Sequence, residues 1–186
     1  MYRLLVLAFI VAILPLTARA QGGNVFFGYS YLNAESPLSS FGSNRSSIHG
    51  WDASLEGKLL PFVGIVADLS GHYGDEDVNV LCPGVSCASG TTSARQYNFV
   101  FGPRASVSVG KLVPFAHYLV GASHISTSGP NNIGSDTSFS QAVGGGIDYK
   151  LLPLIGWRFQ GDFLQTRFFS NTQNNFRLST GIVVRF

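Results

Sequence analysis

Hydrophobic and polar positions alternate with a period of two along most of this chain, most regularly in the last twelve residues, 175–186. Side chains point to opposite faces of a β-strand, so this stretch predicts a strand with one apolar face. A tilted strand needs roughly nine to eleven residues to cross a bilayer, against about five or six in a globular strand. The stretch therefore predicts a membrane-crossing strand. Its apolar parity is Phe176, Leu178, Thr180, Ile182, Val184 and Phe186, and its other parity is Arg177, Ser179, Gly181, Val183 and Arg185.

A motif of Lys, two aliphatic residues, Pro and an apolar residue occurs three times, at 58–62, 111–115 and 150–154. Proline cannot donate to a sheet ladder, so each copy predicts a turn or a strand end. Four longer segments rich in Ser, Asn, Gly and Asp separate the other alternating stretches, and they lie at roughly 34–46, 74–94, 126–137 and 169–174. Together these connections predict eight strands, at about 24–33, 47–58, 62–73, 95–110, 115–126, 138–150, 156–167 and 175–186.

Short turns at one end and longer loops at the other are typical of outer-membrane barrels. We therefore predict an all-β fold, an eight-stranded antiparallel up-and-down transmembrane β-barrel with both termini periplasmic. With its apolar face inward, the same pattern would give a soluble barrel of lipocalin type. Charge placement favours the membrane orientation, because nearly all charged residues within the strands lie on the polar parity. Aromatic residues near the strand ends are also placed as in an interfacial girdle. They are Tyr73, Tyr97, Phe115, Tyr149, Trp157, Phe168, Phe169 and Phe186.

The polar parity also predicts a network of charges in the lumen. Side chains just fill the interior of an eight-stranded barrel, and unpaired charges there are costly, so we expect paired charges that plug the channel. Asp68 with Arg104, and Asp148 with Arg158, are expected to be cross-strand neighbours. The full set is Asp52, Glu56, Asp68, Arg104, Asp148, Arg158, Asp162, Arg177 and Arg185.

The N-terminal residues predict export. One basic residue precedes an apolar run from Leu4 to Leu16, and a small-x-small site ends at Ala20. We predict a secretory signal peptide over 1–20, cleaved between Ala20 and Gln21, which leaves an outer-membrane barrel domain over 21–186. No Cys follows this site, so a lipid-anchored lipoprotein is not expected. No peptidoglycan-binding domain is expected after the last strand.

Composition narrows the class further. Two of the 12 basic residues, Arg3 and Arg19, lie in the signal peptide, so the mature chain balances its remaining ten against 10 acidic residues. A nucleic-acid surface needs clustered Lys and Arg, so that function is not expected. Only 12% of residues are charged, about half the usual share, which suits a lipid-facing exterior.

Parity, strand length and the aromatic last residue resemble the small OmpA-like and OmpX-like outer-membrane barrel families over the whole mature length. In those families the terminal Phe is read by the barrel assembly machinery, so the resemblance implies that Phe186 is an assembly signal. We expect a monomer in the cell outer membrane, in contact with outer-membrane lipids and lipopolysaccharide. We expect no cofactor and no metal site.

Two motifs carry possible chemistry. Cys82 and Cys87 lie in the second long segment, and an exported chain with two cysteines typically forms a disulfide, so we predict that they pair. His124 and Ser126 are similar to the pair in lipid A 3-O-deacylases, which are also eight-stranded. In that family a Glu on the following strand orients the His, whereas the predicted strand 138–150 carries no Glu, and Asp136, just before it, could at best substitute.

We therefore predict a non-enzymatic outer-membrane barrel with a side-chain-filled lumen and no catalytic residue. Its role would be structural, or surface interaction of four extracellular loops with an unidentified ligand. Two alternatives stay open: an outer-leaflet lipid-modifying enzyme of the lipid A deacylase type, and a secreted soluble ligand-binding barrel.

Overall fold

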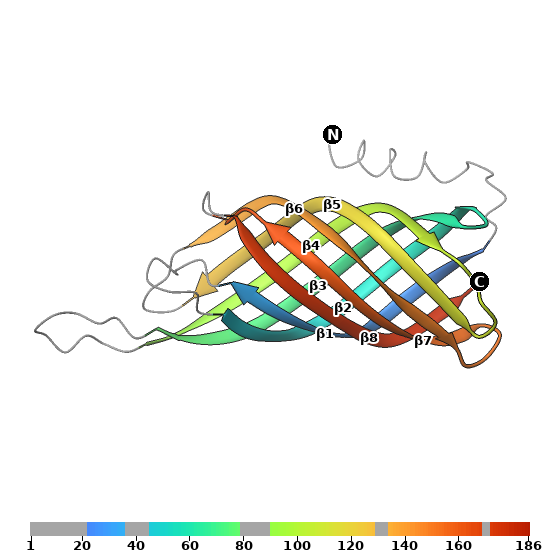
Figure 1. Ribbon diagram of the computed structural model, residues 1–186. Coiled ribbons are helices and arrows are strands. Elements are labelled where there is room, and N and C mark those ends of the chain that lie inside the picture. Colours follow the sequence, from blue (N-terminus) through green and yellow to red (C-terminus); the bar gives the residue numbers. More distant parts are fainter. Residues whose placement is uncertain (1–21, 36–44, 79–89, 129–133, 169–171) are drawn as a thin grey trace, which may run out of the picture.

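A computed structural model describes residues 22–35, 45–78, 90–128, 134–168 and 172–186. Within these residues the chain forms one closed antiparallel barrel, in which sequential strands pair and β1 pairs with β8 (Figure 1). No helix in this part of the chain is long and apolar enough to cross a membrane. The predicted eight-stranded barrel is confirmed. Its strands are β1 (Gly23–Glu35), β2 (Arg45–Leu60), β3 (Val63–Val78), β4 (Gly90–Ser106), β5 (Leu112–Ser128), β6 (Ser135–Lys150), β7 (Ile155–Thr166) and β8 (Gln173–Arg185).

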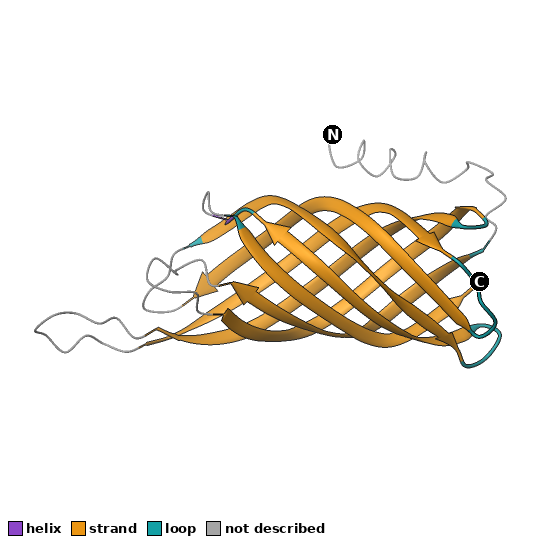
Figure 2. Cartoon of the chain, viewed as in Figure 1, coloured by secondary structure: helices purple, strands orange, loops and turns teal. Residues whose placement is uncertain are grey.

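The three short turns lie at one end of the barrel, which we call the turn end (Figure 2). Phe186 lies there too, since its carbonyl oxygen accepts from the amide of Gly23 at 2.9 Å. The second turn differs from the prediction, because Pro114 already belongs to β5 and residues 107–111 make the turn instead, with Gly110 at a φ of 61°. The fourth strand therefore ends at Ser106 rather than at residue 110.

Several predicted features lie outside the described residues. These are the signal peptide over 1–20 with its Ala20–Gln21 cleavage site, the Cys82–Cys87 pair, and Phe169. The described strand ends that flank 36–44, 79–89, 129–133 and 169–171 lie at the end of the barrel opposite the turns (Figure 1).

The strands are tilted, so rows of paired residues climb around the barrel. The pairing that starts at Gly23 passes once round the sheet and returns to β1 at Asn33. Side chains from strands that are not neighbours in the sequence therefore meet inside the lumen. A closed, tilted sheet of this size has an interior that side chains fill.

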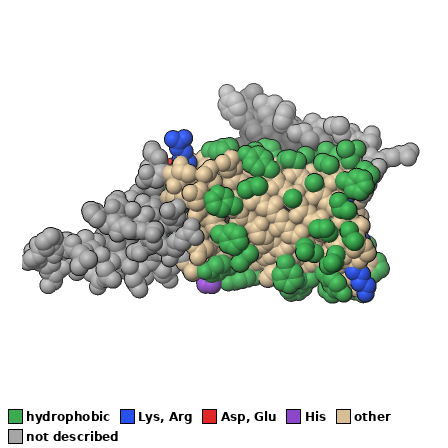
Figure 3. All heavy atoms as spheres, in the orientation of Figure 1, with side chains coloured by type: hydrophobic (Ala, Val, Ile, Leu, Met, Phe, Trp, Pro, Cys, Tyr) green, Lys and Arg blue, Asp and Glu red, His purple; other side chains and the backbone are tan. Residues whose placement is uncertain are grey.

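The outer face is apolar. Phe27, Phe99 and Phe159 are each more than half exposed, as are many other outward aliphatic and aromatic residues. Figure 3 shows hydrophobic side chains spread over the visible face, with charged ones only near its two ends. So large an exposed apolar surface requires lipid around it, which confirms the membrane orientation over the soluble one.

Two girdle predictions are wrong. Phe115 and Phe168 are 8% and 0% exposed, because Phe115 lies on the lumen face of β5 and Phe168 is buried just beyond the end of β7. The other described girdle residues are exposed, namely Tyr73, Tyr97, Tyr149, Trp157 and Phe186.

Candidate functional site

The deeper part of the lumen holds one arginine among three aspartates, which we call the acidic cluster (Asp52, Asp68, Asp162 and Arg177). On β2, β7 and β8, Asp52, Asp162 and Arg177 lie farther from the turn end than Glu56, Arg158 and Arg185 do. The guanidinium of Arg177 donates to Asp162 at 2.6 Å and to Asp68 at 2.8 Å. All four side chains are 0–1% exposed.

Asp52 has the weakest contacts in the acidic cluster. Its nearest cation is Arg177, at 3.9 Å, and neither carboxylate oxygen has a hydrogen-bond partner among the described residues. A buried carboxylate without hydrogen bonds is destabilising. This cluster is therefore rich in negative charge and only partly compensated.

The turn end of the lumen holds the opposite excess, in a group of residues that we call the mouth cluster. Arg158 donates to both oxygens of Asp148, at 2.7 and 3.0 Å, and Arg185 donates to the same carboxylate at 3.3 Å. Arg104 donates to Glu56 at 3.1 Å. Two lysines complete the cluster, which consists of Glu56, Lys58, Arg104, Asp148, Lys150, Arg158 and Arg185.

Polar and aromatic side chains hold the mouth arginines in place. Asn24 accepts from Arg158 at 3.1 Å and donates to Glu56 at 2.7 Å, so it bridges the two ion pairs. The ring of Phe115 lies between two guanidinium groups, 4.3 Å from the Cζ of Arg104 and 4.8 Å from the Cζ of Arg158. Such cation–π contacts are strongest where water is excluded.

His117 joins the two clusters. Its Nδ1 accepts from Arg104 at 3.3 Å, and its Nε2 donates to Asp162 at 2.8 Å. One acceptor and one donor nitrogen are the pattern of a neutral imidazole. The hydrogen-bonded chain therefore runs without a break from Arg185 at the turn end to Asp68 in the interior.

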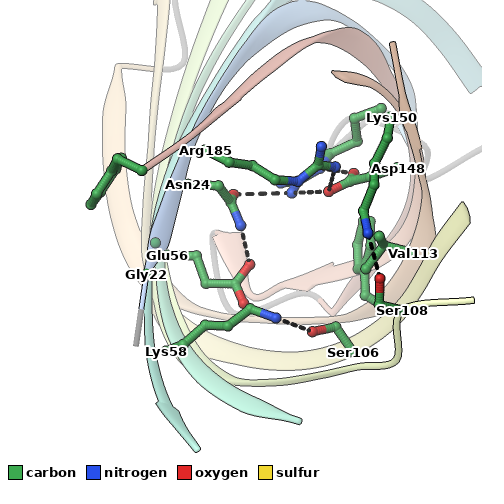
Figure 4. A pocket seen from close by; sticks show the side chains of 14 residues that line it. Gly22, Asn24, Glu56, Lys58, Ser106, Ser108, Val113, Asp148, Lys150 and Arg185 are labelled. Carbon is green, nitrogen blue, oxygen red and sulfur yellow. Dashed lines mark hydrogen bonds and ion pairs between the residues drawn. The ribbon is translucent and has the colours of Figure 1, made fainter. Parts of the chain in front are cut away.

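A cavity of about 220 Å³ lies inside the mouth cluster at the turn end. Figure 4 shows Lys58, Lys150 and Arg185 around it, with Asn24 and Asp148. Lys58 donates to Ser106 at 3.2 Å, and Lys150 donates to Ser108 at 2.5 Å and to the carbonyl of Gly110 at 3.3 Å. In the part of the chain that the structure describes, no group of His, Cys, Asp or Glu is arranged to hold a metal ion.

The structure places all nine predicted lumen charges on the inner face. Asp148 pairs with Arg158 in the sheet register and by ion pair, as expected. The expected pairing of Asp68 with Arg104 is wrong, because the register sets Asp68 opposite Val100 and Arg104 opposite Gly64. Asp68 pairs instead with Arg177, across the lumen.

Sequence reasoning missed Lys58, Lys150 and the central place of His117. The repeated motif that contains both lysines predicts only a turn or a strand end. Their parity was the available signal, since Lys58 follows Glu56 by two residues and Lys150 follows Asp148 by two. A residue two positions beyond an inward one also faces inward.

The deacylase-like residues do not assemble on one face. His124 and Ser126 lie on the outer face of β5, and His124 Nδ1 bonds the hydroxyl of Thr137 at 2.7 Å. Asp136 lies next to Thr137 on β6 and therefore on the opposite, lumen side. It does not orient His124, so the geometry gives that histidine a hydroxyl partner in place of a carboxylate.

No protein-family model and no curated protein matches this chain. Its fold is similar to that of Ail, the attachment invasion locus protein of Yersinia pestis, in a crystal structure with the heparin analogue sucrose octasulfate. The two chains are 14% identical, the match covers 89% of this chain and 98% of that chain, and the TM-score is 0.59. It is similar to Neisserial surface protein A, with 13% identity, 88% and 97% covered, and a TM-score of 0.61. OprG from Pseudomonas aeruginosa gives 9% identity, 90% and 96% covered, and a TM-score of 0.57.

At these identities the likeness establishes the fold. Together with the apolar exterior, it confirms the predicted resemblance and the outer-membrane location. The chain is an outer-membrane β-barrel with a lumen filled by side chains.

Proposed function

We propose that this protein is a non-enzymatic outer-membrane barrel that contacts other molecules through the segments opposite the turn end. The β3–β4 hairpin carries the proposal. Its pairing continues to Val78 and Gly90, and it extends past the ends of β1, β7 and β8 (Figure 1). Residues 79–89 therefore join the two strands that reach farthest from the barrel.

The filled lumen supports a scaffold role. The ion pairs of the two clusters lie inside the barrel, where Arg177 and Asp68 connect β8 with β3, and Leu32, Val100 and Leu164 belong to an apolar group that fills further space. A channel would need an open water-filled path, as larger barrels have. The end opposite the turns is then available for contact with another macromolecule.

The charge of the hairpin bears on the class of partner. Residues 74–94 include Asp75, Glu76 and Asp77 but no Lys or Arg. An acidic segment repels a sulfated polyanion such as the ligand in the Ail complex. We therefore propose a protein partner with a neutral or basic surface. The Ser, Asn and Gly residues of this segment supply adaptable hydrogen bonds to such a surface.

The test compares cells that display the protein with cells that do not, on surfaces coated with extracellular-matrix glycoproteins or with heparin. We expect binding to a glycoprotein surface, lost when residues 79–89 are replaced by a Gly-Ser linker and kept when 129–133 are replaced. Heparin should not be bound. Failure to bind any glycoprotein, or altered lipid A acyl chains in the expressing cells, would contradict the proposal.

We also propose that Cys82 and Cys87 form a disulfide that closes this segment, because export exposes them to an oxidising compartment. Thiol labelling of the denatured, unreduced protein should then find no reactive cysteine. Two labelled thiols would refute the pairing. Replacement of both by Ser should leave the barrel assembled.

Phe186 is proposed as the signal for the assembly machinery, because it continues the apolar parity of β8 with an aromatic side chain. This residue is 66% exposed, at the turn end. Its deletion should lower the outer-membrane yield, whereas changes at Asn131 or Asn132 should not. Equal yields would show that the residue has no such role.

A further inference from the structure

The cavity at the turn end is lined by more cations than its carboxylates can neutralise. Four cationic side chains of the mouth cluster line it, against two carboxylates, and the fifth cation of the cluster, Arg104, lies outside the lining. Glu56 is engaged by Arg104, and Asp148 by Arg158 and Arg185. The ammonium groups of Lys58 and Lys150 donate only to neutral oxygens among the described contacts. Phe186 also lines the cavity, and even with a carboxylate there the whole mouth cluster keeps a surplus of two positive charges.

The cavity also has unused hydrogen-bond donors. The Nη1 of Arg185 is buried and has no partner among the described residues. An ammonium group has three donors, and the two lysines use one and two of theirs. Donors from β2, β6 and β8 therefore surround one space of about 220 Å³. Liquid water takes about 30 Å³ per molecule, so the space is ample for a tetrahedral oxyanion.

The residues that follow these lysines toward the turns are apolar and exposed. Leu59 and Leu60 follow Lys58, and Leu151 and Leu152 follow Lys150, and all four leucines are more than half exposed. The lysines are half-buried and line the cavity, while the leucines extend the apolar exterior to the rim. The cavity thus opens where the lipid surface ends and head groups begin.

We propose that this cavity binds a phosphate ester, with Lys58, Lys150 and Arg185 as its donors. Cationic donors that converge on one space are the usual basis of phosphate recognition. The phosphate can come from a lipid head group at the rim or from a soluble ester. This site lies at the end opposite the proposed contact surface, so each proposal can fail without the other.

The experiment uses the whole barrel, purified in a zwitterionic detergent, with glycerol phosphate as the soluble probe. Calorimetric titration should show binding that falls by about tenfold or more in Lys58→Gln/Lys150→Gln. The matched control is Lys111→Gln, because Lys111 begins the second copy of the same motif but is exposed and lies outside the cavity lining. A heat-dependent shift in gel mobility verifies that each variant is folded.

The source of the phosphate is decided by native mass spectrometry of barrels released from bilayers of phosphatidylcholine and phosphatidylglycerol. Phosphatidylglycerol retained by the unmodified protein and lost from the double variant would support the site and assign it to a lipid. Binding of glycerol phosphate without lipid retention would support it and assign it to a soluble ester. Absence of both, or an equal loss in Lys111→Gln, would overturn the proposal.

Discussion

The acidic cluster and the mouth cluster lie on three of the same strands, β2, β7 and β8, yet they carry charge surpluses of opposite sign. In the acidic cluster one arginine, Arg177, faces three aspartates, all almost completely buried. In the mouth cluster five cations face two carboxylates, and four of those cations line a cavity. Glu56 and Asp148 are already engaged there by arginines.

The difference shows how access to water sets the role of a charge. A buried cation whose partners cannot be solvated fixes the positions of the strands that supply those partners. Half-buried lysines at a mouth keep some hydration, so their surplus costs little and is available to a ligand. Buried ion pairs therefore fix strand positions deep in the lumen, whereas half-buried lysines at the mouth are available to a ligand.

The largest effect is expected at Arg177, whose loss leaves Asp68 and Asp162 without their cation. Arg177→Met should lower the free energy of unfolding by about 3–5 kcal/mol, the usual cost when one partner of a buried pair is removed. Urea titration of the folded barrel in micelles would measure it. Arg177→Lys serves as the control and should lose less, because it keeps the charge but not the fork. An unchanged midpoint in Arg177→Met would show that the acidic cluster does not hold the strands.

A smaller effect is expected from the link between the clusters. Arg104 and Asp162 do not touch, but both hydrogen-bond His117. A double-mutant cycle with Arg104→Gln and Asp162→Asn should give a coupling energy of about 0.5–2 kcal/mol. The same cycle in a His117→Phe background is the control and should give none. Strict additivity in the unmodified background would mean that the two clusters are energetically separate.

The smallest effect on stability is expected from the mouth lysines. Lys58→Gln and Lys150→Gln should each change the free energy of unfolding by no more than about 0.5 kcal/mol, because their partners are neutral and partly hydrated. The urea titration used for Arg177 measures this directly. A loss as large as that of Arg177→Met would erase the contrast between a structural interior and a binding mouth.

The strands and their inner and outer faces follow from the sequence wherever lipid contact imposes alternation, as in β8. Outside the membrane this constraint ends. The third strand continues through Asp75, Glu76 and Asp77 to Val78, residues whose composition predicted a loop, because their backbone pairs with the start of β4. The aromatic type of Phe115 predicts a place in the girdle, but its parity within β5 puts it on the lumen face.

The partners within the lumen were harder to predict than the faces. Arg177 reaches Asp68, 109 residues away in the sequence, because both point into a narrow interior from strands that are not adjacent. Pairing across a lumen depends on side-chain length and on the tilt of the strands. Neighbour relations in the sheet describe only pairs such as Asp148 and Arg158.

The proposed scaffold role requires that the paired charges close the lumen, so that the barrel is not a pore. Current through planar lipid bilayers that contain the purified, unmodified protein tests it most directly. We expect no steady porin-like conductance. Arg104→Ala should increase any small leak, because it removes the contacts of that arginine with Glu56 and His117. A large, stable conductance from the unmodified protein would contradict it.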